Sequence, residues 1–523
     1  MAEMRCGIFL RRFLFVVGVV LCIGGGLAIY YWPSTFSAII EQNVILSEGS
    51  DSHKLWMEAP MKLTMLYHFF NLTNPEDITN PSKKLNFVEM GPYAFTQRIE
   101  KENVTWDSEN GTVTFIERNF YYFDPELSKG SLDDRITSLS IPAVMAAHKS
   151  QDWNFLSRKG LSIAIGRLST ITSTHTAGEL MFEGYEDPLF DLADTFPSDE
   201  PVPERFGWFF EFNGTSQETT FTMDTGEKDI RNIGRLWKFD GMEETGFFDG
   251  ECGKVRGSAG HMWAPKLKKT NITLFIESLC RSVTLPFSGE TTVEGIPAYK
   301  FTGDRRFVDN GTLDESSSCF CGADGNDCLP VGGLNMSVCH RDTPVVVTFP
   351  HFYLADPWYT ENITGMTPDP EKHSFYMSLE PTAGYPIDVR ARTQVNVYLK
   401  PSSHISLFNK VREVIFPIMW AEGRAVMTPK LLGLTEKMVT GESLGMMACI
   451  ATVAIGALLI LVSLILCWIS SRRGKREVKR PPVERGPAAD PLMGTSSIPH
   501  GNKPWTELQP ISGGFRYTNG NTN

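Results

Sequence analysis

Cysteine is the residue whose number and spacing carry the most chemistry in this chain of 523 residues. Six of the ten cysteines fall within residues 252–339, and such an even cluster is typical of disulfide bonds formed in an oxidising compartment. A zinc site is the alternative, but C-x-C-x6-C-x10-C is not a zinc-ligand spacing and no histidine pair accompanies it. We therefore predict disulfides and no metal site, and spacing alone leaves fifteen pairings open among Cys252, Cys280, Cys319, Cys321, Cys328 and Cys339.

Motifs for catalysis are absent from the sequence. It contains no G-x-S-x-G, H-E-x-x-H, G-x-x-x-x-G-K-[ST] or G-x-G-x-x-G, and its ten histidines form no i, i+4 pair. The run Asp324-Gly325-Asn326-Asp327 hints at a calcium loop, but it lacks the glycine and the bidentate glutamate at their offsets, so a turn in a disulfide loop explains it better. We expect neither an enzyme nor a bound cofactor.

Asparagine marks a second kind of covalent chemistry. Eight N-x-[ST] sequences without a central proline lie between residues 33 and 445, and none lies nearer either end. One such motif is weak, but eight in one segment predict a glycosylated region outside the cytosol. The acceptors would be Asn71, Asn103, Asn110, Asn213, Asn271, Asn310, Asn335 and Asn362.

Two uncharged apolar runs, at residues 13–32 and 446–469, explain how that region leaves the cytosol. At 1.5 Å per residue, each helix would cross a hydrocarbon core of about 30 Å. A cleaved signal peptide is the alternative for the first run, but its apolar stretch exceeds the roughly 7–15 residues of such signals and no A-x-A site follows. We predict membrane anchors at residues 13–32 and 445–469.

Positive charge sets the orientation of the two anchors. Three arginines precede the first anchor and a run of Lys and Arg follows the second, so both tails, 1–12 and 470–523, should be cytoplasmic. The longer tail is rich in Pro, Gly and Asn and is predicted to be disordered. Cys6 and Cys467 beside the membrane are palmitoylation candidates, and small apolar residues of a helix are an equally good interpretation.

The segment 33–444 is predicted to be one α+β ectodomain. Its net charge is −19, because the whole chain carries −12 and the two tails together carry +7. The charge of −12 already excludes a generic basic nucleic-acid binder, so we expect no nucleic-acid partner. NVTWDSENGTVTFIERNFYYF predicts a β-hairpin, since Asn110-Gly111 is the pair that a type I′ turn needs. TQVNVYLKP alternates like a half-buried strand, and residues 141–192 are helix-rich. Short helices are expected next to each anchor.

Eight distinctive segments follow one another between Arg11 and Ile469, and in that order they resemble the class B scavenger receptors, the family of the fatty-acid translocase and the lysosomal integral membrane protein type 2. So many long matches make the resemblance specific. The segments are GPYAF (91–95), ENVTWDSENGTVTF (102–115), GYEDP (184–188), LCRSV (279–283), GIPAYKF (295–301), CFC (319–321), PHFYLADP (350–357) and LEPTAGYPIDVRARTQVNVYLKPS (379–402).

The resemblance implies a large antiparallel β-barrel with an internal hydrophobic tunnel and an apical helical bundle at about residues 141–192. It also implies the disulfides Cys252–Cys319, Cys280–Cys339 and Cys321–Cys328. The implied function is capture of lipids, lipoproteins or lipid-bearing particles at the apex and transfer of lipid through the tunnel to the membrane. The partners would include fatty acids, sterols, carotenoids or phospholipids.

Four apical residues are implied as ligand contacts or sensors. The family's ligand-binding lysine corresponds to Arg167, with Arg158 and Lys159 nearby; the alternative is solvated charge on a helix. His148 lies close to the position of a pH-sensing histidine in the lysosomal relative, and a structural histidine is the alternative. Lysosomal members carry an acidic residue four positions before a Leu-Leu or Leu-Ile pair in the tail. Here Ala488 stands at that position before Leu492-Met493, so the signal is absent. We expect the protein to lie in the plasma membrane, with the endosomal or lysosomal membrane as the alternative location.

Two other functions compete with lipid transfer. An adhesion, protein-binding or lysosomal sorting receptor would use the same ectodomain without moving lipid. A ligand-gated channel shares two anchors and internal termini, but the anchors contain little polar lining for a pore. The sequence does not decide between a monomer and a homo-oligomer.

Overall fold

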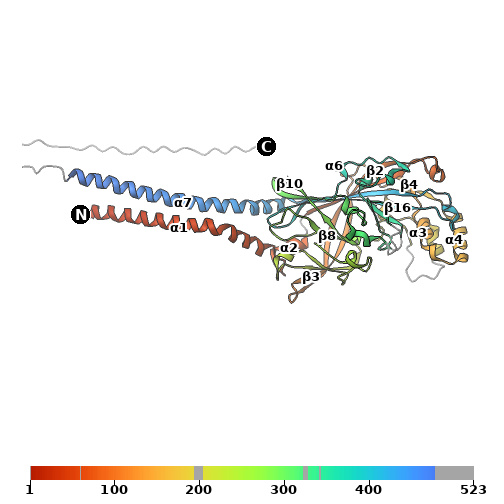
Figure 1. Ribbon diagram of the computed structural model, residues 1–523, viewed down its shortest axis with the longest axis horizontal. Helices are drawn as coiled ribbons and strands as arrows, with labels where there is room; N and C mark the ends of the chain where they lie inside the picture. The colour runs from red at the N-terminus through yellow and green to blue at the C-terminus, as the bar shows by residue number, and fades with distance from the viewer. Residues whose placement is uncertain (1, 59–60, 194–203, 322–327, 341–342, 478–523) are drawn as a thin grey trace, which may run out of the picture. The chain divides into compact units, whose positions relative to one another are not determined.

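The computed structural model describes residues 2–58, 61–193, 204–321, 328–340 and 343–477. The chain divides into two compact units, Gly18–Ala457 and Met1–Val17 with Leu458–Asn523. All described strands belong to Gly18–Ala457 (Figure 1). The tail residues 478–523, the run at 324–327 and the side chain of Cys6 lie outside the described residues.

Two long helices contain the apolar runs. These are α1 (Ala2–Val44) and α7 (Pro429–Glu477), and both are long and apolar enough to cross a membrane. Each helix continues beyond its predicted anchor into the short helix expected beside it, so each anchor and its neighbouring helix form one rod. Within Gly18–Ala457 the two rods touch, since the Trp32 indole N–H donates to the Glu442 carbonyl at 2.9 Å.

The centre of the fold is one large sheet with the strand order β10-β11-β15-β16-β17-β1-β2-β3-β6-β7. Its pairs are antiparallel, except that β14 runs parallel to β2. The strands are β1 (Met61–Leu72), β2 (Leu85–Asp107), β3 (Thr112–Phe123), β6 (Ser216–Asp224), β7 (Leu236–Phe239), β10 (Phe287–Val293), β11 (Ile296–Thr302), β12 (Gly333–Asn335), β13 (Val345–Thr348), β14 (Ile363–Thr364), β15 (Tyr376–Leu379), β16 (Pro386–Leu399) and β17 (Val414–Met427).

The expectation of a closed barrel is wrong. Among the described residues, the end strands β7 and β10 do not pair with each other, so the sheet is open. The strands between them in the chain, β8 (Ile272–Ile276) and β9 (Arg281–Leu285), pair with one another as a hairpin. Isolated bridges of Ser258 to Arg235 and Leu274 connect this hairpin to the β7 end of the sheet. The mixed helix-and-sheet class is confirmed.

The β2–β3 hairpin is present, but its turn is not type I′. Asp107 pairs with Thr112, so the loop has four residues, and of the Asn110-Gly111 pair only Gly111 has positive φ. The reason is local: the Asp107 carboxylate accepts both the backbone N–H and the side-chain amide of Asn110, at 3.0 and 2.7 Å. A type I′ turn needs positive φ at both central residues.

The helix-rich segment contains α3 (Ile141–Lys149), α4 (Phe155–Leu168), a π-helical turn at Glu179–Glu183 and α5 (Pro188–Ala193). A strand, β5 (Thr172–Thr176), interrupts it and pairs with β4 (Arg135–Leu139). In Figure 1, α3 and α4 lie at the end of the sheet away from the end where α1 and α7 meet it. Among the described residues, the remaining short α-helices are α2 (Asp51–Glu58) and α6 (Pro370–His373).

Three disulfides join the segment that follows β7. They link Cys252 to Cys319, Cys280 to Cys339 and Cys321 to Cys328, the pairing that the family resemblance implies. Two of them close loops of 67 and 59 residues. They therefore restrain a region whose regular structure consists of short strands and single helical turns.

Candidate functional site

Helix α4 carries a stripe of alternating apolar and basic side chains. Phe155, Lys159, Ile163 and Arg167 are spaced four residues apart, so they share one face. All four are exposed, and the apolar members reach 73% for Phe155 and 54% for Ile163. We call this row the α4 stripe. Large apolar side chains beside unpaired surface cations are suited to a lipid surface or an anionic amphiphile.

The opposite face of α4 fixes the helix to neighbouring segments of Gly18–Ala457. The Asn154 side chain caps the helix by accepting the Ser157 N–H at 3.0 Å. Ser162 is buried, and its hydroxyl accepts the Ser406 N–H at 2.9 Å. This anchoring leaves the α4 stripe free of internal packing.

The structure separates the other two apical candidates from the stripe. Arg158 is half-buried and donates to the Gln151 carbonyl at 3.0 Å. His148 lies on α3, half-buried, with its Nδ1 3.2 Å from the side-chain amide of Gln151. Of the four residues named from the sequence, only Lys159 and Arg167 therefore share an exposed face.

One face of the central strands is apolar and incompletely covered. Register places Ala391 of β16, Gly423 of β17 and Met65 of β1 in one row across the sheet. These residues and their neighbours on that face, Val389, Val395, Ala421 and Leu63, are only half-buried. We call this surface the inner face; the structure does not delineate a tunnel along it. Small and apolar side chains that pack against the core clusters yet stay partly exposed could contact an acyl chain or a sterol.

The structure confirms the prediction for TQVNVYLKP only in its second half, where Val397 and Leu399 are buried, because the β16–β17 register shifts between Val395 and Asn396. The strand is present, but its polar Gln394 and Asn396 are completely buried while Val395 is not. The amide of Asn396 donates to the Val346 carbonyl of β13, its paired neighbour in the sheet, at 2.9 Å. The Gln394 side chain accepts the His351 N–H at 2.6 Å, from the turn Pro350–Phe352. Alternation in sequence cannot tell which of two faces a neighbouring segment will cover.

Where β2 and β3 continue the inner face, it becomes polar. Glu117 of β3 lies 3.6 Å from the buried Lys101 ammonium of β2 and 3.1 Å from the His261 imidazole. The Glu277 carboxyl is close to this cluster. Burial, followed by the negative charge of Glu117, raises the pKa of the Glu277 carboxyl to about 7. Sequence reasoning missed this cluster, because no local motif unites residues so far apart in the chain.

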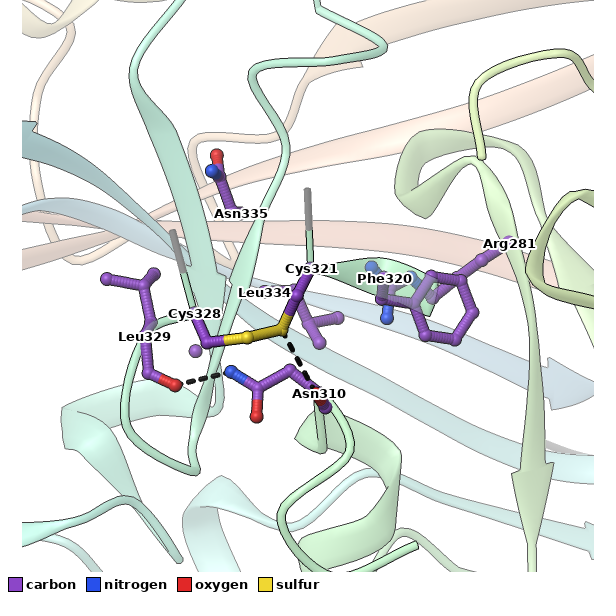
Figure 2. Close-up of a pocket in the computed structure, with 9 residues that line it drawn as sticks. Arg281, Asn310, Phe320, Cys321, Cys328, Leu329, Leu334 and Asn335 are labelled. Atoms are coloured by element: carbon purple, nitrogen blue, oxygen red, sulfur yellow. Dashed lines mark hydrogen bonds between the residues drawn. A yellow bond between two sulfur atoms is a disulfide. The ribbon is translucent and has the colours of Figure 1, made fainter. Parts of the chain in front are cut away.

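The sequence-predicted glycosylation sites differ in access. Asn103, Asn110, Asn213 and Asn271 are exposed, whereas Asn71, Asn335 and Asn362 are half-buried. Asn310 is buried, and Figure 2 shows its side-chain amide pointing at the Leu329 carbonyl, to which it donates a hydrogen bond beside the Cys321–Cys328 disulfide. The amide nitrogen that would carry a glycan is thus occupied.

Cysteine and histidine come together at one further point. The sulfurs of Cys280 and Cys339 lie near His340 in a group that could in principle hold a metal ion. The two sulfurs form a disulfide, which removes both thiolate ligands. Of the palmitoylation candidates, Cys467 is exposed on α7.

Two helices long and apolar enough to cross a membrane, together with a large disulfide-linked sheet region, define a membrane protein. The chain belongs to the CD36 family, whose model matches residues 16–467.

Individual relatives support the same class. The chain is 37% identical to Protein peste of Drosophila melanogaster over 78% of this chain and 75% of the relative. It is 29% identical to scavenger receptor class B member 1 of Cricetulus griseus, covering 88% and 92% of the two chains. Lysosome membrane protein 2 of Rattus norvegicus is also 29% identical, over 73% and 78%. These relatives support a class B scavenger receptor role.

Proposed function

We propose that this receptor captures lipids, lipoproteins or lipid-bearing particles on the α4 stripe and passes lipid along the inner face of the sheet to the membrane. The half-buried apolar row of Ala391, Gly423 and Met65 carries the proposal. A lipid that follows this row avoids exposing its chain to water, which costs about 0.8 kcal/mol per CH₂. One relative is named a scavenger receptor and another a lysosome membrane protein. These names support the plasma membrane, the endosome or the lysosome as the location of this receptor.

Blocking the inner face tests the transfer step. Gly423 has the Met65 sulfur at 3.4 Å and the Ala391 Cβ at 3.5 Å from the position of a Cβ, so Gly423→Trp would fill the row. We expect cells expressing this variant to bind labelled lipoprotein but to take up several-fold less of its lipid. The matched control is Lys62→Trp, at an exposed position on the opposite face. Unchanged lipid uptake with Gly423→Trp at normal surface expression would exclude the inner face as the route and favour an adhesion receptor.

Charge reversal tests the capture step. Arg167→Glu on the α4 stripe should lower uptake of anionic lipid while surface expression persists, because a carboxylate repels the ligand headgroup. Arg305→Glu, at another exposed arginine, is the control for net charge. If both variants take up lipid like the native receptor, Arg167 is not part of the site. His148→Ala, assayed for ligand release between pH 7 and 5, tests the proposed apical pH sensor in the same cells.

A further inference from the structure

Two stacked imidazoles hold one loop of the ectodomain by its backbone. The rings of His351 and His373 lie 4.4 Å apart and 17° from parallel. His351 Nδ1 accepts the Thr367 N–H at 3.1 Å, and His373 Nδ1 accepts the Asp369 N–H at 2.9 Å. An imidazole nitrogen accepts a hydrogen bond only while it is unprotonated. Both contacts therefore exist only in the neutral form of each ring.

A carboxylate with access to solvent adjoins this pair. Glu89 of β2 contacts His351 Nε2 at 2.6 Å and His68 Nδ1 at 2.8 Å, and the Trp420 indole N–H donates to it at 3.3 Å. The Glu89 side chain is 34% exposed, whereas that of His351 is 4% exposed. Protons can therefore reach the buried rings from solvent beside Glu89.

The charges around the two rings come from every neighbouring element. Glu89 lies on β2, His68 on β1, Arg392 on β16, and Asp369 in the loop itself. Burial, and then the charges of His351 and Arg392, lower the pKa of His373 to about 4, while Glu89 and Asp369 act in the opposite direction. In the folded state the two carboxylates thus do not outweigh burial and the neighbouring positive charges at His373.

The backbone at His351 is strained, which indicates that its surroundings determine its position. His351 and Phe352 both have positive φ, at 53° and 57°, a left-handed conformation that residues other than glycine rarely adopt. The His351 N–H is held by the buried Gln394 side chain at 2.6 Å. The ring is therefore presented to Thr367 from a fixed position and has little freedom to move aside when it gains a proton.

We propose that His351 and His373 form an acid-released clamp that holds residues 365–369 on the sheet at neutral pH and frees them in an acidic compartment. A proton on either Nδ1 turns an acceptor into a donor that faces a backbone N–H, so the hydrogen bond is replaced by repulsion. Protonation of both rings also places two positive charges in a stack. The freed loop joins β14, which pairs with β2 at Leu85 and Asn86, to α6. The proposal concerns a site remote from α4 and does not depend on lipid transfer.

Amide hydrogen exchange on the full chain in detergent tests the clamp. For a histidine whose pKa is about 4 in the closed clamp and about 6.5 in the open one, opening becomes about thirty-fold more frequent from pH 7.5 to pH 5. After correction for intrinsic exchange, the protection of Thr367 and Asp369 should fall by at least ten-fold, while amides in the centre of β17 stay protected.

Substitution by asparagine separates titration from structure, because its Oδ1 accepts from the same place as Nδ1 but takes up no proton in this range. The double variant His351→Asn, His373→Asn should keep the loop protected at both pH values. His175→Asn, at a histidine stacked on Tyr185, should respond to pH like the native chain. Equal protection of the native loop at pH 7.5 and 5, or an equal fall in the double variant, would overturn the proposal. If the double variant does not fold, His373→Asn alone must reduce the fall at Asp369.

Discussion

Glu277 offers a sharp test of the electrostatics of the inner face. Its carboxyl lies in the short helical turn Glu277–Leu279, where burial, followed by repulsion from Glu117, raises its pKa from 4.5 to about 7. The folded protein therefore holds this proton more tightly than the unfolded chain does. Its contribution to stability is complete below pH 4.5 and is lost as the pH rises through 7.

The size of the effect follows from the two pKa values. A change from 4.5 to about 7 corresponds to about 3 kcal/mol at pH 8, and because the carboxyl is partly exposed we expect about 1–2 kcal/mol. Glu277→Gln removes the charge but keeps the shape. We expect the variant to be more stable than the native chain at pH 8 by that amount, equivalent to a rise of a few degrees in Tm.

Thermal unfolding of the full chain in detergent at pH 8 and pH 5 is the measurement. The advantage of Glu277→Gln should be much smaller at pH 5, where the native carboxyl already holds its proton. Glu294→Gln, at an exposed glutamate, should show no such dependence on pH. A variant that is less stable than the native chain at pH 8, or equally shifted at both pH values, would refute the reasoning.

Two other predictions concern covalent chemistry. Replacing Cys280 and Cys339 together by serine opens a loop of 59 residues and should cost about 4 kcal/mol of unfolding free energy, measured by thermal unfolding, whereas Cys449→Ser at a free cysteine should cost far less. Asn310→Gln should leave the glycan mass of the folded receptor unchanged, because the amide is buried, while Asn103→Gln should lower it by one glycan on a deglycosylation gel. A mass loss with Asn310→Gln would show that the site is modified before it is buried.

Local chemistry explains what could be predicted for the fold. A run of about 20 apolar residues is long enough to cross a bilayer as a helix, so the anchors could be predicted without a structure. The β2–β3 hairpin was visible for a similar reason, since its two strands adjoin in the chain. Its turn type was not, because the Asp107 side chain competes for Asn110. The helix-rich segment was found, but the pairing of β5 with β4 was not.

By itself, the sequence determined the membrane topology to be expected, the family, the cluster of cysteines and the basic residues of α4, because each depends on composition or on neighbours along the chain. Only the tertiary structure decided that the sheet stays open, that Gln394 and Asn396 are buried while Val395 is not, and that Asn310 is enclosed. It also brought Glu89, His351 and His373 together from three separate segments. Such contacts arise from strand pairing and from loops that cover one face of a sheet, and neither is encoded in local spacing.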